Sequence, residues 1–276
     1  MKRFLCCWVL SVEIACFSAG QTIHYPLRIE GMGIGAGIKP FADAFSFVLN
    51  PASLASQESL TAGVYDERRF LMSELNLYSL ACSFPAAGGG LGVQLAYSGF
   101  AAYNESTIML AYGKKLGKLI DLGVQFNYTL FHISGYGPAG SVQAAAGMLI
   151  HPSEKMTLGV YVFNPAGENI GKHSGEKIAS LYKTSMGYYA SAQVYVGVDL
   201  IKEEGRPFAM QVAMHYQFAG QFFAGLGILT FPGIPYGWAG WMRKGLRIDM
   251  HVSYHPQLGF TPALACFLGS PFHHKD

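Results

Sequence analysis

The stretch from Leu122 to Leu130, LGVQFNYTL, alternates bulky apolar residues with small or polar ones at every position. Successive side chains of a β-strand point to opposite faces. This stretch therefore predicts a strand with one apolar face and one face of glycine, glutamine, asparagine and threonine. The same period of two recurs in four further segments: Leu91–Ser98, Gln193–Leu200, Met210–Gln217 and Arg247–Tyr254. The chain is therefore predicted to be all-β.

The composition of the two faces distinguishes between two kinds of β-protein. The 276-residue chain is 51% hydrophobic and only 13% charged, whereas soluble domains carry about 25% charged residues. Beyond residue 20 no stretch approaches the roughly 18 apolar residues of a membrane helix. An exported soluble β-sandwich, the alternative, would show a charged outer face, but here the polar face is small and neutral. We predict a transmembrane antiparallel β-barrel with its apolar face toward lipid.

Turn signals divide the chain into about fourteen strands, an even number as in bacterial outer-membrane barrels. The predicted strands span residues 57–66, 73–84, 89–99, 105–115, 119–131, 140–151, 155–163, 180–189, 192–202, 207–218, 221–231, 235–243, 246–255 and 258–268. Segments 73–84 and 221–243 alternate poorly, so twelve strands are the alternative. Tyr97, Tyr128 and Tyr216 lie near strand ends and fit the aromatic girdle of such a barrel.

The connections between the predicted strands differ in length according to their order. Those after odd-numbered strands are the longer ones, and the longest is Asn164–Ala179. Those after even-numbered strands, such as Pro85–Gly88 and Leu116–Lys118, are short. Outer-membrane barrels have short periplasmic turns and longer outer loops. We therefore expect a periplasmic N-terminus and a barrel with only modest outer loops.

The N-terminus has the features of a secretory signal peptide. Two basic residues precede an apolar core at Phe4–Val12, and Ser18–Gly20 supplies small residues before the expected cleavage site. Lipidation at Cys16, disfavoured by Glu13 three positions upstream, and an uncleaved helical anchor are the alternatives. The predicted organisation is a signal peptide (1–20), a plug segment (21–56), an outer-membrane barrel (57–268) and a C-terminal tail (269–276).

Two cysteines, Cys82 and Cys266, lie outside the predicted signal peptide. They fall on the second and the last predicted strands, which flank the first strand if the sheet closes. Strands two apart in a sheet are separated by roughly 10 Å, at about 4.8 Å per step, which is too far for a disulfide. We expect both cysteines to be separate residues of the barrel wall.

The segment from Leu27 to Ser56, LRIEGMGIGAGIKPFADAFSFVLNPASLAS, precedes the first predicted strand and does not alternate. Its glycines, among them Gly31 and Gly33, permit close backbone approach and positive φ. Pro51 restricts Asn50 to extended or turn geometry. We expect the segment to fold into or against the lumen as a plug. A dinucleotide-binding loop is the competing interpretation, but no βαβ strand precedes the glycines.

Six ionisable residues are predicted to face the lumen. They are Lys183, Asp199, His215, Arg247, Asp249 and His251. Burying a single charge is costly, so these groups should find partners. Arg247 and Asp249 are two residues apart on one face and can pair with each other or with groups of the plug. A structural network is the favoured interpretation, and a path for a ligand or an ion is the alternative.

Other functional classes have little support in the sequence. The formal net charge of +2 argues against a nucleic-acid partner, since such proteins carry a basic patch. His215 and His251 lack the partner residues and spacing of a metal site, and we expect neither a metal nor another cofactor. No nucleophile or pair of carboxylates stands out, and we expect a protein that is not an enzyme.

Three stretches, taken in order, resemble a known family. They are Arg28–Ala36 together with Asn50–Ala55, then Val64–Asn76, and finally Tyr254–Gly259. Within the first, the residues expected to form the plug are Arg28, Gly31, Gly33, Asn50, Pro51 and Ala52. The set is similar to the FadL-like outer-membrane barrels, especially the PorV/PorQ family of the Bacteroidetes.

The resemblance implies a fourteen-stranded barrel with an N-terminal plug, embedded in the lipid of the bacterial outer membrane. PorV relatives serve type IX secretion, which implies a non-catalytic accessory or docking role with secretion-system proteins as partners. FadL-like transporters take up hydrophobic molecules, which implies the alternative of a channel for a hydrophobic small molecule. This chain is shorter than those transporters and lacks their long outer loops, which favours the docking role.

Overall fold

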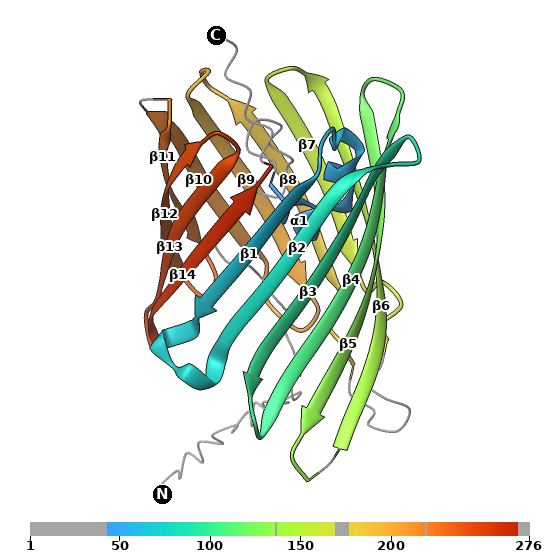
Figure 1. Cartoon of the computed structure of the whole chain (residues 1–276), viewed down its shortest axis with the longest axis vertical. Coiled ribbons are helices and arrows are strands. Elements are labelled where there is room, and N and C mark those ends of the chain that lie inside the picture. The colour runs from blue at the N-terminus through green and yellow to red at the C-terminus, as the bar shows by residue number, and fades with distance from the viewer. Residues whose placement is uncertain (1–42, 136, 169–176, 219, 270–276) are drawn as a thin grey trace, which may run out of the picture.

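The computed structural model describes residues 43–135, 137–168, 177–218 and 220–269, which form a closed antiparallel β-barrel (Figure 1). The strands follow one another around the barrel in chain order, and β1 pairs with β14 to close it. Their bounds are β1 Thr61–Arg68, β2 Asn76–Ala86, β3 Gly89–Phe100, β4 Tyr103–Leu116, β5 Ile120–Ile133, β6 Gly137–Ser153, β7 Met156–Phe163, β8 Leu181–Tyr189, β9 Val194–Glu203, β10 Ala209–Phe218, β11 Phe222–Leu229, β12 Ile234–Arg243, β13 Leu246–His255 and β14 Gly259–Leu268. The predicted fourteen strands are confirmed, and the alternative of twelve is wrong.

Burial along β5 is that of a membrane barrel. Gln125, Asn127 and Thr129 are buried on the inner face, whereas Val124 and Phe126 are 48% and 57% exposed on the outer face. The same alternation runs along β4, β6 and β13. A soluble protein buries its large apolar residues, so this reversed arrangement gives an outer surface suited to lipid. The predicted fold class, an all-β transmembrane antiparallel barrel, is confirmed.

Three predicted strand starts differ from the structure by three or four residues, and one of them is that of β6, which begins at Gly137 rather than at residue 140. β1 begins at Thr61 rather than at residue 57, because Pro51–Ser56 forms a 3₁₀ helix (η2) and the chain then bends at Ser59 before the strand starts. The Gln57 side-chain Nε2 donates a hydrogen bond to Thr61 Oγ1 at 3.2 Å. β2 begins at Asn76 rather than at residue 73, because Ser73–Leu75 forms another 3₁₀ turn (η4).

Short helices lie inside the barrel and in the first hairpin. The helix α1 (Ser46–Leu49) is followed by η2, and both lie within the barrel near the end at which β1 begins (Figure 1). At the opposite end, η3 (Arg69–Leu71) and η4 connect β1 to β2. No helix among the described residues is long and apolar enough to cross a membrane.

The longest connection, between β7 and β8, folds partly onto the barrel interior. Asn164 Nδ2 donates to the carbonyl oxygen of Ile178 at 2.7 Å, and the backbone N–H of Glu168 donates to Asn164 Oδ1 at 3.1 Å. Ile178 is buried in a cluster with Phe131 and Phe163. Asn164 and Ile178 are therefore buried at the two ends of this loop, whereas the residues next to them, Pro165, Ala166, Glu168 and Lys177, are exposed.

Cys82 and Cys266 do not form a disulfide. Each pairs with β1, Cys82 opposite Ala62 and Cys266 opposite Val64, so they lie on strands either side of β1. The expectation that both are separate wall residues is confirmed.

The assignment of the outer face to lipid predicts that a charged substitution there destabilises the barrel more near the middle of the bilayer than near its edge. Phe126 lies in the middle of the outer face of β5. We expect Phe126→Arg to destabilise the barrel in a bilayer, lowering its free energy of unfolding by about 2–4 kcal/mol. Leu116→Arg, at the end of β4, should cost only about 0–1 kcal/mol. Urea unfolding in lipid vesicles measures both variants, and equal effects would contradict the assignment of this face to lipid.

Candidate functional site: the plugged lumen

The sequence Asn50-Pro51 sets the path of the chain inside the lumen. Asn50 has extended backbone angles, φ −162° and ψ 114°, as expected before proline. Its side-chain Oδ1 accepts a hydrogen bond from the backbone N–H of Ala52 at 3.1 Å, which caps η2, and Pro51 occupies the first position of that helix. The chain therefore turns sharply from α1 into η2. We call Asp43–Ser56 the inner segment.

The amide of Asn50 also fastens the inner segment to the barrel wall. Its Nδ2 donates to the backbone carbonyl oxygens of Met148 on β6 and Val160 on β7, at 3.4 and 3.2 Å. Asn50 is only 2% exposed, and each of these bonds satisfies a polar group that water does not reach. On the next strand, Lys183 Nζ donates to the carbonyl oxygen of Leu49 at 3.0 Å. This bond holds the C-terminal end of α1.

Four inward-facing glycines form the surface on which η2 lies. They are Gly90 on β3, Gly113 on β4, Gly123 on β5 and Gly147 on β6, and we call them the glycine row. A Cβ atom on Gly123 would lie 2.3 Å from the carbonyl carbon of Pro51, and one on Gly147 would lie 2.0 Å from Asn50 Oδ1. No side chain fits at such distances. The glycine row therefore permits direct contact of the η2 backbone with β3, β4 and β5, and of the Asn50 side chain with β6.

The first part of the inner segment is fixed by aromatic packing. Phe45 contacts Tyr65 and Phe267 edge-on, with ring centroids 6.3 and 6.0 Å apart. Phe47 lies against Gly92 of β3, where an added Cβ would be 2.8 Å from its ring. These side chains belong to one buried cluster at the β14–β1–β2 side of the barrel.

A buried charge cluster joins the start of the inner segment to β13. Arg247 Nε donates to Asp249 Oδ1 at 2.9 Å, and Arg247 Nη1 lies 3.5 Å from Asp43 Oδ2. The guanidinium carbon of Arg247 stands 4.9 and 4.8 Å from the ring centroids of Phe223 and Phe267. Burial raises the pKa of the Asp43 carboxyl above its ordinary value, although Arg247 opposes that shift. Both pairings considered for Arg247, with its strand neighbour and with the plug, therefore occur.

The six predicted lumen residues are all buried, and they lie at several places along the inner wall. His251 Nε2 lies 3.9 Å from Asp249 Oδ2, beside the Arg247 cluster. Lys183 instead lies at the other end of α1. His215 belongs to an aromatic group, where its Nδ1 accepts a hydrogen bond from Trp238 Nε1 at 3.2 Å. Asp199 is 2% exposed on β9.

Among the predicted plug residues, the structure places Asn50, Pro51 and Ala52 in the lumen, all buried. Arg28, Gly31 and Gly33 lie outside the described residues, as do the predicted signal peptide and most of the predicted tail.

Sequence reasoning missed the glycine row and a polar pair near it. His151 Nε2 lies 2.9 Å from Asp121 Oδ2, and its Nδ1 lies 3.3 Å from Thr157 Oγ1. The glycines were visible as part of the small inner face, but nothing in the sequence indicated which of them touch the inner segment. Among the described residues no group of three or more His, Cys, Asp or Glu side chains could hold a metal ion.

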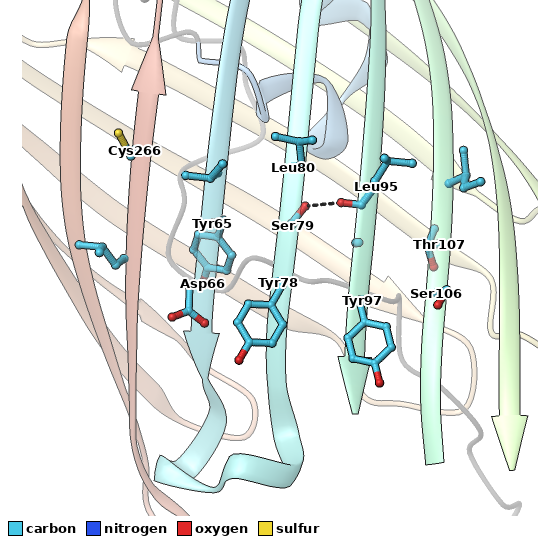
Figure 2. Close-up of a pocket in the computed structure, with 14 residues that line it drawn as sticks. Tyr65, Asp66, Tyr78, Ser79, Leu80, Leu95, Tyr97, Ser106, Thr107 and Cys266 are labelled. Carbon is cyan, nitrogen blue, oxygen red and sulfur yellow. Dashed lines mark hydrogen bonds between the residues drawn. The ribbon is translucent and has the colours of Figure 1, made fainter. Parts of the chain in front are cut away.

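A groove of about 540 Å³ lies on the outer side of the wall, over strands β14 and β1 to β4 (Figure 2). We call it the outer groove. Its floor is apolar, and the side chains that form it include Val64, Leu80, Leu95, Ile108 and Leu264.

The more exposed polar side chains of the outer groove lie at one end, whereas the buried Ser79 and Thr107 lie behind its middle (Figure 2). Figure 2 shows Asp66, Tyr78, Tyr97 and Ser106 below the apolar side chains, toward the β1–β2 loop.

Comparison with known proteins identifies the fold. No family model and no curated protein sequence matches the chain. Among solved structures, a FadL homologue of Pseudomonas aeruginosa matches with a TM-score of 0.55 and 12% identity, over 85% of this chain and 96% of that one. A deletion mutant of the monoaromatic hydrocarbon channel TodX matches with a TM-score of 0.61 and 8% identity, over 87% and 99%. Omp33 of Acinetobacter baumannii matches with a TM-score of 0.53 and 9% identity, over 78% of this chain and 99% of that one.

Identities this low show the fold alone. The chain has the fold of the FadL-type outer-membrane barrels. Its closed fourteen-stranded barrel with an apolar outer face bears out the predicted location in the outer membrane. These neighbours are outer-membrane channels and barrels rather than enzymes.

The close contact at the glycine row predicts that even one methyl group there will displace the inner segment. We expect Gly123→Ala to expose the buried Ala52, because overpacking costs about 1–3 kcal/mol. The measurement is the maleimide labelling rate of an Ala52→Cys reporter with Cys82 and Cys266 replaced by serine. It should rise about tenfold.

Gly237→Ala on β12 is the matched control, since an added Cβ there would be 3.1 Å from the end of the flexible Leu226 side chain. Similar labelling rates in both variants would show that the inner segment does not rest on the glycine row.

The buried pair of Arg247 and Asp249 predicts strong coupling between the two residues. Arg247→Leu and Asp249→Asn should each lower the unfolding free energy by about 3–5 kcal/mol, because each leaves a buried charge without its partner on β13. The double variant should lose less unfolding free energy than the sum of the losses in the two single variants. Thermal or urea unfolding of the reconstituted barrel measures this cycle, and additive losses would contradict the pairing.

Proposed function

We propose that this chain is a non-catalytic barrel acting as an accessory or docking component of protein export, with type IX secretion as the candidate system. The observation that carries the proposal is the fixed inner segment, which is fastened at both ends of α1 and rests on the wall along η2. The sequence resemblance to the PorV/PorQ family supports the choice of system.

A fixed inner segment favours a scaffold over a conduit. Passage through the lumen would require the bonds from Asn50 to β6 and β7, from Lys183 to Leu49 and from Arg247 to Asp43 to break together. Each involves buried groups whose loss of partners is costly. We therefore assign the inner segment the role of a permanent plug and place partner contacts on the exterior.

The β1–β2 loop is the exterior element best suited to contact a partner. Its residues Leu71 and Met72 are 59% and 50% exposed. Phe70 and Leu71 have positive φ values of 53° and 60°, which is unfavourable for bulky residues. The strained conformation is held by a hydrogen bond from the Phe70 N–H to Thr261 Oγ1 at 3.0 Å. Strain of this kind concentrates at functional loops.

The docking role predicts a site-specific cross-link. A photoreactive amino acid at Leu71 should cross-link to a secreted cargo protein or a translocon subunit in native outer membranes, identified by mass spectrometry. The same probe at Leu122, on the lipid-facing wall, should give no such product. Absence of secretion-system proteins at Leu71, with the barrel correctly assembled, would contradict the proposed function.

A channel for a hydrophobic small molecule is the second candidate, because an apolar outer groove exists and the fold is shared with a toluene transporter. If this is the function, cells carrying the chain should take up radiolabelled toluene or a fatty acid several-fold faster than cells lacking it. Equal uptake would remove this candidate and leave the docking role.

A further inference from the structure

The outer groove combines an apolar floor with a carboxylate at one end. Val64 and Leu80 are 51% and 49% exposed on the lipid-facing side, and Asp66 lies two residues beyond Val64 on the same face of β1. In the strand register Asp66 lies opposite Tyr78 on β2 and Leu264 on β14. The carboxylate is therefore set into the lipid-facing wall, at the level where the tyrosines mark the membrane boundary.

Asp66 has no oppositely charged partner within the described part of the chain. No ion pair or hydrogen bond to its carboxylate is found there. Arg68 lies two residues further toward the loop on the same face of β1, and no ion pair joins it to Asp66. A carboxylate facing lipid is unfavourable without a compensating charge or donor. A cationic lipid headgroup at this level would supply that charge.

Tyrosine hydroxyls extend the polar end of the groove. The Tyr78 hydroxyl accepts a hydrogen bond from Asn76 Nδ2 at 3.0 Å, which leaves its own proton free to be donated. Tyr97 and Ser106 pair across β3 and β4 next to it. A ligand bound here would contact one carboxylate and several hydroxyl groups at the polar end, and the apolar floor of the outer groove beyond them.

We propose that the outer groove is a binding site for a phospholipid whose headgroup carries a protonated primary amine. The amine donates to the Asp66 carboxylate, a headgroup oxygen accepts from the Tyr78 hydroxyl, and an acyl chain lies along Val64, Leu80 and Leu95. The volume of about 540 Å³ falls within the range of small-molecule sites. This inference goes beyond the proposed function, because it requires neither a secretion partner nor an open lumen.

Native mass spectrometry of the intact barrel tests the site. The barrel is reconstituted in nanodiscs with equal amounts of phosphatidylethanolamine, phosphatidylcholine and phosphatidylglycerol of identical acyl chains. Phosphatidylethanolamine should be retained preferentially, because the quaternary amine of phosphatidylcholine cannot donate and phosphatidylglycerol has no cation. Asp66→Asn should lower its retention about tenfold, as expected for the loss of a hydrogen bond between charged groups.

Three variants define the outcome, each checked for folding by heat-modifiable mobility. Asp66→Glu should keep the preference, and Glu74→Gln, an acid at the same end outside the groove, should leave it unchanged. Leu95→Trp should reduce retention of all three lipids by filling the groove. Equal retention of the three lipids by the parent chain, or an unchanged preference in Asp66→Asn, would overturn the proposal. A protein found cross-linked to a probe at Leu95 in native membranes would do the same.

Discussion

The arrangement of the whole barrel depends on one close contact, that of the η2 backbone with the glycine row. A Cβ on Gly113 would lie 2.5 Å from the carbonyl oxygen of Pro51, and one on Gly90 would lie 2.3 Å from that of Leu54. The four successive strands β3 to β6 must therefore each carry a glycine on the inner face where the inner segment lies against them. This constraint explains why a chain with 34 glycines keeps several of them inside strands, where glycine is otherwise unfavourable.

The remaining lumen contacts follow from that placement. Once η2 lies on β3 to β6, the Asn50 amide is directed at the carbonyl oxygens of β6 and β7, and Leu49 presents its carbonyl oxygen to Lys183. Asp43 then lies beside Arg247, on the other side of the barrel. The inner segment thus bridges the wall in several directions, which is why we assign it the part of a scaffold and place binding functions on the exterior.

The period of two predicted most of the fold, because a membrane barrel exposes one face of each strand to lipid along its whole length. Segments such as Leu122–Leu130 therefore carry the signal in full. The start of β1 was predicted too early, since the end of η2 is set by contact with distant glycines and leaves no local pattern. The inward positions of Arg247 and Asp249 were predictable from strand parity, but the partnership with Asp43 depends on the path of the inner segment. The outer groove arises from side chains of five neighbouring strands, a combination that no single stretch reveals.

The most direct test of the account is a disulfide between the inner segment and the wall. A Cβ on Gly63 of β1 would lie 3.3 Å from the Cβ of Ala44, close to the spacing that a disulfide spans. It would also lie 2.9 and 3.0 Å from the rings of Phe267 and Phe45, which must shift to admit it. With Cys82 and Cys266 replaced by serine, Ala44→Cys combined with Gly63→Cys should form an intramolecular disulfide on mild oxidation of native outer membranes. If both thiols stayed free and reacted with a maleimide in a correctly assembled barrel, the inner segment would not occupy the lumen.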